Sequence, residues 1–366
     1  MKRLMTDSAA QTQSSFFEKA LMPGDLTGFL SGNGFTSDRV YYLTDSNVHT
    51  HCLNSLAHEL DVKADHLLVI NPGESSKDLE IVEELILKLA EAGCNRDCVL
   101  VNFGGGVVTD IGGFLASVYK RGIPYVNVPT SLLGMVDASI GSKTGVDAGS
   151  IKNIIGTIND PLAVMIDPSF LDSLPDAEWR NGLSEIIKHA LIADKGLWQE
   201  ISAIQSGEFS KDTRQKIKDL VPRASKVKHD IVVQDKHESA ERLALNFGHT
   251  LGHAIESVSM RSSSPWPHGK AVAAGIIMEL IISKHSDGFP EPDLRMVSGY
   301  LSNLHDLRAG IEKHADALLD MIRHDKKQRS EGLRFCYIPQ IGEFRIGVLD
   351  DMDLISKAIE EYPRYV

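Results

Sequence analysis

The sequence has no long apolar run and few cysteines. Its most apolar stretch, AVAAGIIMELII, is twelve residues long and is interrupted by Glu279, so it predicts a buried helix and not a membrane span. The N-terminal residues MKRLMTDSAAQTQ include basic residues, but no apolar segment follows them, and we expect no signal peptide. The four cysteines form no CxxC pair, which predicts reduced thiols in a cytoplasmic protein.

The sequence also lacks an excess of positive charge. It has 50 acidic residues against 38 Lys and Arg, which gives a formal net charge of −12. We therefore expect neither nucleic acid nor an anionic membrane as a partner. A small anionic substrate is still compatible with this charge, because a local basic pocket can lie within an acidic protein.

A chain of 366 residues usually forms more than one hydrophobic core, and the pattern of strand-like and helical segments changes near residue 168. We predict two domains, residues 1–167 and 168–366. In the first, helical patterns alternate with strand-like runs, which is typical of a parallel α/β sheet. These runs are RVYYLT, HLLVI, CVLVNF, PYVNVP and AVMID. In the second, helical patterns dominate, and one small hairpin is predicted at LRFCYIP and EFRIGV.

Two glycine-containing segments of the first domain are candidate ligand sites. FGGGVVTD places three glycines between a strand and a helix, where backbone N–H groups can approach a pyrophosphate. It is not a GxGxxG fingerprint, and a tight turn explains the glycines equally well. DASIGSKTGVDAGSIKN carries Asp137, Lys143, Lys152 and Asn153. It is interpreted either as a solvated loop or as an anion site at the carboxyl edge of the sheet.

Two charged pairs in the second domain have equally open interpretations. Glu185 and Lys188 lie three residues apart among apolar neighbours in LSEIIKHALIAD. They form either a surface ion pair or a buried pair that needs partners or a ligand. Lys326 and Lys327, in HDKK, form either a solvated charge run or part of a pocket.

The segment LNFGHTLGHAIE predicts a helix with His249 and His253 on one face and Asn246 one turn earlier. Such a pair can present two imidazoles to zinc, but it also fits two ordinary histidines. The residue after His249 is Thr, so the segment is not the HExxH motif of zinc peptidases. A catalytic zinc would need a third protein ligand, for which His268 and Glu185 are the candidates.

Taken in order, these segments resemble the 3-dehydroquinate synthase family of the sugar-phosphate cyclase superfamily. The resemblance covers nearly the whole chain and is carried by GGGVVTDIGGF, YKRGIPYVNVPTSLLGMVDASIGSKTGV, KNIIG, GLSEIIKHALI, LNFGHTLGHAIE, HGKAVAAGI and DKK. It implies a Rossmann-like NAD-binding α/β domain followed by an α-helical domain that binds the metal and the substrate.

The resemblance also implies an activity. Enzymes of this family are phosphate-eliminating carbon–oxygen lyases of the shikimate pathway, which leads to chorismate and the aromatic amino acids. They convert the small anionic substrate 3-deoxy-D-arabino-heptulosonate 7-phosphate into 3-dehydroquinate and phosphate. The reaction proceeds by transient oxidation, elimination, reduction, ring opening and aldol closure. NAD is used and regenerated, and the metal is Zn²⁺ or Co²⁺.

Site residues follow from the family's motifs. The implied metal ligands are Glu185, His249 and His268. The residues implied to contact NAD or border its site are Asp45, Glu74, Lys77, Gly105, Gly106, Asp110, Thr130, Ser131, Asp137, Lys143 and Lys152. The residues implied to bind the substrate are Arg121, Lys152, Asn153, Lys188, Lys228, Arg242, Asn246, His253 and one of Lys326 and Lys327. The residues implied to act in catalysis are Lys143, Glu185, Lys188, Asn246 and His253.

The family pattern further implies a homodimer in which Arg121 reaches the partner's site. There are three departures: Ser142 replaces a usual glycine, His189 replaces a common tyrosine, and DKHESAER replaces the usual acid-rich run before Arg242. Serine adopts a positive φ less readily than glycine does. The family pattern therefore does not predict the backbone conformation at Ser142. The rival interpretations are a valiolone-type or deoxy-inosose synthase, a metal-dependent NAD polyol dehydrogenase, and an inactive binding protein. Asn246 and the DKK lysines favour the dehydroquinate synthase pattern.

Overall fold

The structure is a computed structural model that describes residues 15–17, 23–53, 60–149, 151–260, 265–308, 315–328 and 332–366. The chain divides into two compact units. One contains the described residues up to Pro129 together with Ser142–Asp167, and the other contains Thr130–Gly141 and the described residues from Pro168 onward. Within the described ranges, every helix is too short or too polar to cross a membrane.

The first unit is built on a six-stranded parallel sheet in the order β1-β8-β5-β4-β2-β3. The central strands β4 and β5 are buried along their whole length, as expected for parallel strands covered on both faces. The predicted parallel α/β sheet is confirmed, and only the three-residue β1 was not predicted. The strands are β1 (Ser15–Phe17), β2 (Val40–Asp45), β3 (Leu67–Ile70), β4 (Val99–Gly104), β5 (Tyr125–Pro129) and β8 (Ala163–Met165).

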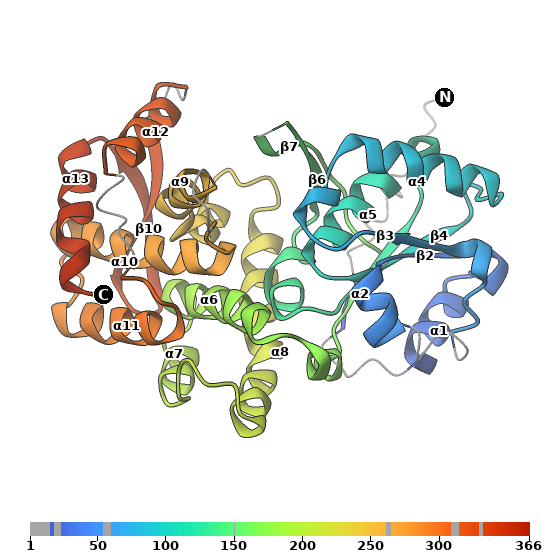
Figure 1. Cartoon of the computed structure of the whole chain (residues 1–366), viewed down its shortest axis with the longest axis horizontal. Helices are drawn as coiled ribbons and strands as arrows, with labels where there is room; N and C mark the ends of the chain where they lie inside the picture. Colours follow the sequence, from blue (N-terminus) through green and yellow to red (C-terminus); the bar gives the residue numbers. More distant parts are fainter. Residues whose placement is uncertain are drawn as a thin grey trace, which may run out of the picture. The chain divides into compact units, whose positions relative to one another are not determined.

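Helices cover both faces of this sheet, with α4 and α5 on one side and α1 and α2 on the other (Figure 1). Helix α5 packs so closely on β4 that a Cβ atom on Gly112 would lie only 1.8 Å from Asn102 Oδ1. The helices are α1 (Pro23–Gly32), α2 (Ser46–Val48), α4 (Leu79–Glu91) and α5 (Gly106–Val118). The short helical turns are η1 (Ser37–Arg39), η2 (His49–Leu53), η3 (Ala64–His66), η4 (Glu74–Ser76) and η5 (Tyr119–Arg121).

The solvated-loop interpretation is wrong for part of the lysine-containing segment, which forms the antiparallel hairpin of β6 (Lys143–Ala148) and β7 (Ile151–Ile158). Its glycines allow the strands to pair closely. A Cβ atom on Gly145 would lie 2.7 Å from Ile155 O, and one on Gly156 would lie 2.5 Å from Thr144 O. Small residues that suggest a flexible loop therefore serve strand pairing here.

The second unit is mostly helical, as predicted, and is arranged around α10 (His268–Asp287). Helices α6, α9, α11 and α13 surround α10 (Figure 1), which is apolar on all sides. The predicted hairpin is present as β9 (Leu333–Gln340) and β10 (Glu343–Leu349). The other elements are η6 (Gly134–Ala138), η7 (Pro168–Ser173), α6 (Asp176–Ala193), α7 (Lys195–Ser202), α8 (Lys211–Gln234), η8 (Glu241–Asn246), α9 (His249–Ser259), α11 (Glu291–Leu304), α12 (Ala315–Gln328), α13 (Met352–Glu361) and η10 (Tyr362–Arg364).

Helix α9 begins later than the sequence predicted. Asn246 ends η8, and Gly248 has φ +77°, so the chain turns before His249 starts the helix. A Cβ atom on Gly248 would also lie 2.5 Å from Ile276 Cγ1. The prediction that Asn246 lies on the helical face of His249 and His253 is therefore wrong, because a left-handed glycine separates it from that helix.

Candidate active site

One residue from each of three helices forms a compact cluster in the second unit. Glu185 comes from α6, His249 opens α9 and His268 opens α10. Glu185 Oε1 lies 3.4 Å from His249 Nε2 and 3.3 Å from His268 Nε2, and the possible ligand atoms of all three lie within 4.8 Å of one another. Ligands about 2.1 Å from a tetrahedral Zn²⁺ would be separated by about 3.4 Å. The geometry therefore fits a zinc ion with a further position left for substrate.

The remaining ring nitrogens of both histidines face oxygen atoms. His249 Nδ1 lies 3.2 Å from Phe247 O, and His268 Nδ1 lies 3.5 Å from Glu256 Oε2. Partners of this kind orient metal-binding imidazoles and fix their tautomers. Glu256 was not identified from the sequence, although its position seven residues after His249 places it on the same face of α9.

The electrostatic environment favours the ionised form of Glu185, whose side chain is fully buried. Burial raises the pKa of this carboxyl, but Lys188 and His249 lower it by more, so the net pKa lies well below the usual value. Burial lowers the pKa of His268, but Glu185 and Glu256 outweigh that effect and raise it to about 10. A metal that binds His268 must therefore displace a proton.

A second group of charges surrounds Asp137, in η6. Lys228 Nζ donates to Asp137 O at 2.7 Å and lies 2.8 Å from its Oδ1. Lys188 Nζ lies 3.5 Å from the same Oδ1 and 2.6 Å from Glu185 Oε2. Burial raises the pKa of Asp137, but the two lysines lower it further, to well below its usual value. The metal cluster and two buried ammonium groups thus share one network.

His189, which replaces a common tyrosine, also faces this network. Its side chain is fully buried, and its Nε2 lies 3.5 Å from Asp137 Oδ1. Within the described ranges, neither of its ring nitrogens has a well-formed hydrogen bond. Burial lowers the pKa of His189, so the ring is neutral near pH 7.

Three other predicted substrate residues have different environments. Arg242 is buried, and its Nη atoms donate to Gly141 O and Lys236 O at 2.6 Å. Asn246 is exposed, and its Nδ2 donates to Glu238 Oε1 at 2.7 Å. His253 is exposed on α9, with its ring 5.2 Å from that of His249. Arg242 is thus anchored to backbone, whereas Asn246 and His253 remain accessible.

In the first unit, four of the predicted NAD-site residues form one ionic network. Lys77 Nζ donates to Asp110 Oδ2 at 2.5 Å and lies 4.0 Å from Glu74 Oε1, which lies 3.8 Å from Lys152 Nζ. Burial lowers the pKa of Lys77, but Asp110 and Glu74 raise it by more. Asp147 N donates to Lys77 O at 2.8 Å, so the β6–β7 hairpin is attached to this network.

Helix termini hold three more NAD candidates of the first unit. Gly105 is the N-cap of α5 and Gly106 its first residue, so no side chain caps the N–H groups at this terminus. Such a terminus suits a pyrophosphate. Asp45, at the end of β2, caps α2 by accepting from Asn47 N and Val48 N.

Thr130 and Ser131 follow β5 and belong to the second unit, where Ser131 Oγ accepts from Gly134 N. In the hairpin of the first unit, Lys143 and Asn153 are both exposed, and Asn153 N donates to Asp147 Oδ1 at 2.7 Å.

Ser142 adopts φ +65° and its hydroxyl donates to Asp160 Oδ1. The position thus keeps the left-handed conformation that glycine would adopt easily. The hydrogen bond to Asp160 holds the serine in it.

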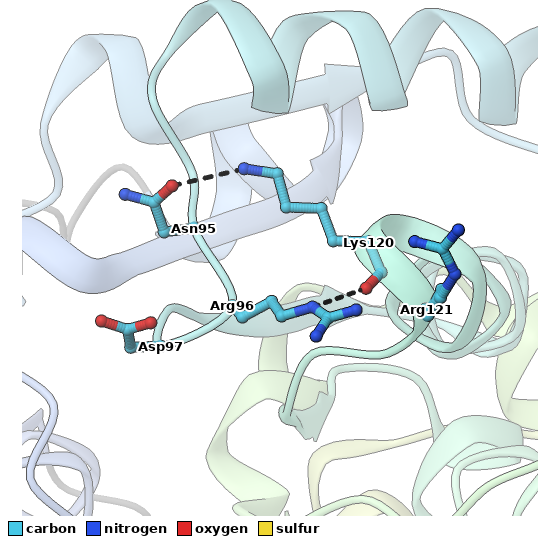
Figure 2. Close-up of a pocket in the computed structure, with 5 residues that line it drawn as sticks. All are labelled: Asn95, Arg96, Asp97, Lys120 and Arg121. Atoms are coloured by element: carbon cyan, nitrogen blue, oxygen red, sulfur yellow. Dashed lines mark hydrogen bonds between the residues drawn. The ribbon is translucent and has the colours of Figure 1, made fainter.

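Arg121 lines a pocket of about 510 Å³ in the first unit, together with Asn95, Arg96, Asp97 and Lys120 (Figure 2). Lys120 and Arg121 both have positive φ, +48° and +68°. Side-chain hydrogen bonds hold this turn: Arg96 Nε donates to Lys120 O at 2.9 Å, and Lys120 Nζ donates to Asn95 Oδ1 at 3.3 Å (Figure 2) and to Cys94 O at 2.6 Å. The turn presents Arg121 at the surface in a constrained conformation.

Lys326 and Lys327 lie on the backbone of α12, but their side chains are outside the described part of the structure. That one of these two lysines binds substrate stays a prediction.

Comparison with known proteins assigns the family. Residues 67–181 match the family model for the 3-dehydroquinate synthase N-terminal domain, and residues 182–328 match the model for its C-terminal domain. The chain is 33% identical to a 3-dehydroquinate synthase of Parabacteroides distasonis, over 93% of this chain and 95% of the relative. It is 38% identical to one of Acidithiobacillus ferrooxidans, over 83% of each chain.

A solved structure shares the fold. It is a 2-epi-5-epi-valiolone synthase of Streptomyces hygroscopicus with NAD⁺ and Zn²⁺ bound, with a TM-score of 0.82 and 25% identity, covering 96% of this chain and 97% of that one. The two family models together with the sequence relatives decide the assignment: the chain belongs to the 3-dehydroquinate synthase family.

Proposed function

We propose that this chain converts 3-deoxy-D-arabino-heptulosonate 7-phosphate into 3-dehydroquinate and phosphate. The observation that carries the proposal is the cluster of Glu185, His249 and His268 beside the buried Lys188. Relatives that match most of the chain are 3-dehydroquinate synthases, which supports the same reaction here. The reaction would place the enzyme in the shikimate pathway.

We propose NAD as the cofactor of the first unit and Zn²⁺ or Co²⁺ as that of the second. The valiolone synthase that shares the fold has NAD⁺ and Zn²⁺ bound, which supports both assignments. When bound, NAD accepts and returns a hydride, and the metal lowers the pKa of a substrate hydroxyl. Glu185, His249 and His268 would hold the metal through one carboxylate oxygen and two imidazole nitrogens.

Residues of the second unit would bind and orient the anionic substrate. The pKa of Lys188 is raised by Asp137 and Glu185 despite the opposing effect of burial, so its ammonium group is a permanent positive charge. Such a charge, fixed before the substrate arrives, stabilises negative charge that develops on it. Asn246 and His253 are exposed and would contact substrate, with His253 able to relay a proton at a ring nitrogen.

Most of the residues proposed to bind NAD lie in the first unit, and Thr130, Ser131 and Asp137 belong to the second. The N-terminus of α5, opened by Gly105 and Gly106, would receive the pyrophosphate. The Glu74, Lys77, Asp110 and Lys152 network would border the cofactor and keep its own charges paired. Asp45, Thr130, Ser131, Asp137 and Lys143 complete the proposed NAD set, and Lys152, Asn153, Lys228, Arg242 and one of Lys326 and Lys327 complete the proposed substrate set.

The proposed assembly is a homodimer in which Arg121 reaches the partner's active site. Its exposure and its constrained turn support this role, since a side chain that acts at a distance benefits from a rigid base. The proposed location is the cytoplasm, because all four cysteines are buried free thiols.

The second candidate is a valiolone-type cyclase, which the TM-score of 0.82 favours. The two activities separate in one assay. Purified protein with NAD⁺ and Zn²⁺ is offered the heptulosonate phosphate or sedoheptulose 7-phosphate, and released phosphate is measured. We expect release from the heptulosonate phosphate alone. Turnover of sedoheptulose 7-phosphate, with none of the heptulosonate, would instead establish the second candidate.

A further inference from the structure

A buried acid of α10 contacts the first turn of α9. Glu279 interrupts the most apolar run of the sequence, and its side chain is fully buried. Its Oε2 accepts from Gly248 N at 2.8 Å, and its Oε1 accepts from Leu251 N at 3.1 Å. Both carboxylate oxygens are therefore used on the backbone of one helix terminus.

Helix α9 needs such an acceptor from outside. The first N–H groups of a helix have no partner within it, and a side chain at the N-cap usually accepts from one of them. The N-cap of α9 is Gly248, which has no side chain. Glu279 supplies the missing acceptor from a neighbouring helix, and a carboxylate also matches the positive end of the helix dipole.

Glycines allow the two helices to approach closely enough for this contact. A Cβ atom on Gly275 would lie 2.0 Å from Gly248 O, and one on Gly252 would lie 3.2 Å from Ala271 O. The backbones of α9 and α10 are thus in direct contact. The distance between these helices cannot increase without separating Glu279 from its two N–H donors.

The contact connects two of the proposed metal ligands. His249 lies between the two residues that donate to Glu279, and His268 opens the helix that carries Glu279. We propose that Glu279 is a positioning residue: it caps α9 from α10 and so fixes His249 relative to His268. This inference rests on the proposed function, because it assumes that the two histidines bind a metal.

The test compares Glu279→Gln with Asp351→Asn in the full chain. Both variants replace a carboxylate at a helix N-terminus by an amide, but Asp351 caps α13 by accepting from Asp353 N at 2.9 Å. Burial raises the pKa of Glu279 and outweighs the opposing effect of the N–H groups of Gly248, Leu251 and Thr250. Its net pKa is about 8, so the comparison is made above pH 8, where the side chain is ionised. The measurements are Co²⁺ affinity of the metal-free protein, the visible spectrum of bound Co²⁺ and stability to denaturant.

We expect Glu279→Gln to bind Co²⁺ about 10- to 100-fold more weakly and to alter the spectrum, as loss of a group that orients metal ligands does. Asp351→Asn, whose amide oxygen can still accept from Asp353 N, should keep the wild-type affinity and spectrum. A folded Glu279→Gln variant with wild-type affinity would overturn the inference alone. A wild-type chain that binds no Co²⁺ would instead overturn the proposed metal site.

Amide hydrogen exchange in the wild-type chain tests the cap even if the variant does not fold. The N–H groups of Gly248 and Leu251 should be protected to the same degree as amides in the middle of α9. Rapid exchange of both, with the rest of α9 protected, would show that Glu279 does not cap the helix.

Discussion

The strongest stability prediction concerns Lys188, whose ammonium group lies between the fully buried carboxylate of Glu185 and the partly buried carboxylate of Asp137. Its Nζ is 2.6 Å from Glu185 Oε2 and 3.5 Å from Asp137 Oδ1, and its side chain is 2% exposed. Lys188→Met keeps the length of the side chain and removes the charge. Glu185 then loses its nearest cation, whereas Asp137 keeps Lys228.

Removal of one partner from a buried ion pair costs about 3–5 kcal/mol where the other charge stays buried without compensation. Because protonated His268 still lies 3.3 Å from Glu185 Oε1, we expect Lys188→Met to lower the unfolding free energy of the metal-free protein by about 3 kcal/mol, the lower end of that range, measured with denaturant. Lys226→Met is the matched control, since Lys226 makes an exposed pair with Asp230 on α8 and should cost about 0.5 kcal/mol. Equal losses for the two variants would refute the reasoning.

Three further predictions follow from the same geometry. His249→Ala should abolish bound metal and activity but keep the far-UV circular dichroism spectrum. His51→Ala, at an exposed histidine, should keep both the metal and the activity. If His249→Ala still binds metal, His249 is not a ligand. Asp235 accepts N–H bonds from Ser239, Ala240 and Arg242, which lower its pKa against the opposing effect of burial, so Asp235→Asn should destabilise the protein at pH 7. That difference should shrink as pH falls below about 4, because the unfolded chain then binds a proton that the native carboxylate does not, and it should vanish only at a much lower pH, where the native carboxyl is protonated as well; a difference independent of pH would contradict it. Mixed Arg121→Ala and His249→Ala chains should regain about a quarter of the wild-type activity, because half of the dimers are mixed and each has one complete site; no recovery in proven mixed dimers would exclude action in the partner's site.

Much of the fold could be predicted because its signals are local. Strands β2 to β5 are short apolar runs, and α4 has apolar residues at helical spacing and ends before Gly93, whose φ is +78°. Contacts between distant segments could not be predicted in this way. Thr130–Gly141 belongs to the second unit although both of its flanking segments belong to the first. The hairpin glycines Gly145 and Gly156 looked like loop residues because their pairing is not local.

The same distinction holds for the candidate site. Spacing suggested His249 and His253 together, and Glu185 and His268 were candidates because a zinc ion needs more ligands. Only the family resemblance implied Glu185, His249 and His268 as one ligand set. Glu279 looked like an interruption of an apolar helix, since its role depends on the backbone of a different helix. Asn246 was misplaced because Gly248 ends the helical pattern without changing the spacing of the polar residues.

If this chain is a lyase that regenerates NAD within each turnover, its phosphate and NADH yields must differ. Both are followed together during turnover of the heptulosonate phosphate with NAD⁺ and Zn²⁺. We expect many phosphates to be released for each enzyme molecule while NADH does not accumulate. NADH that accumulates in proportion to substrate consumed, without phosphate release, would contradict this expectation and establish a dehydrogenase.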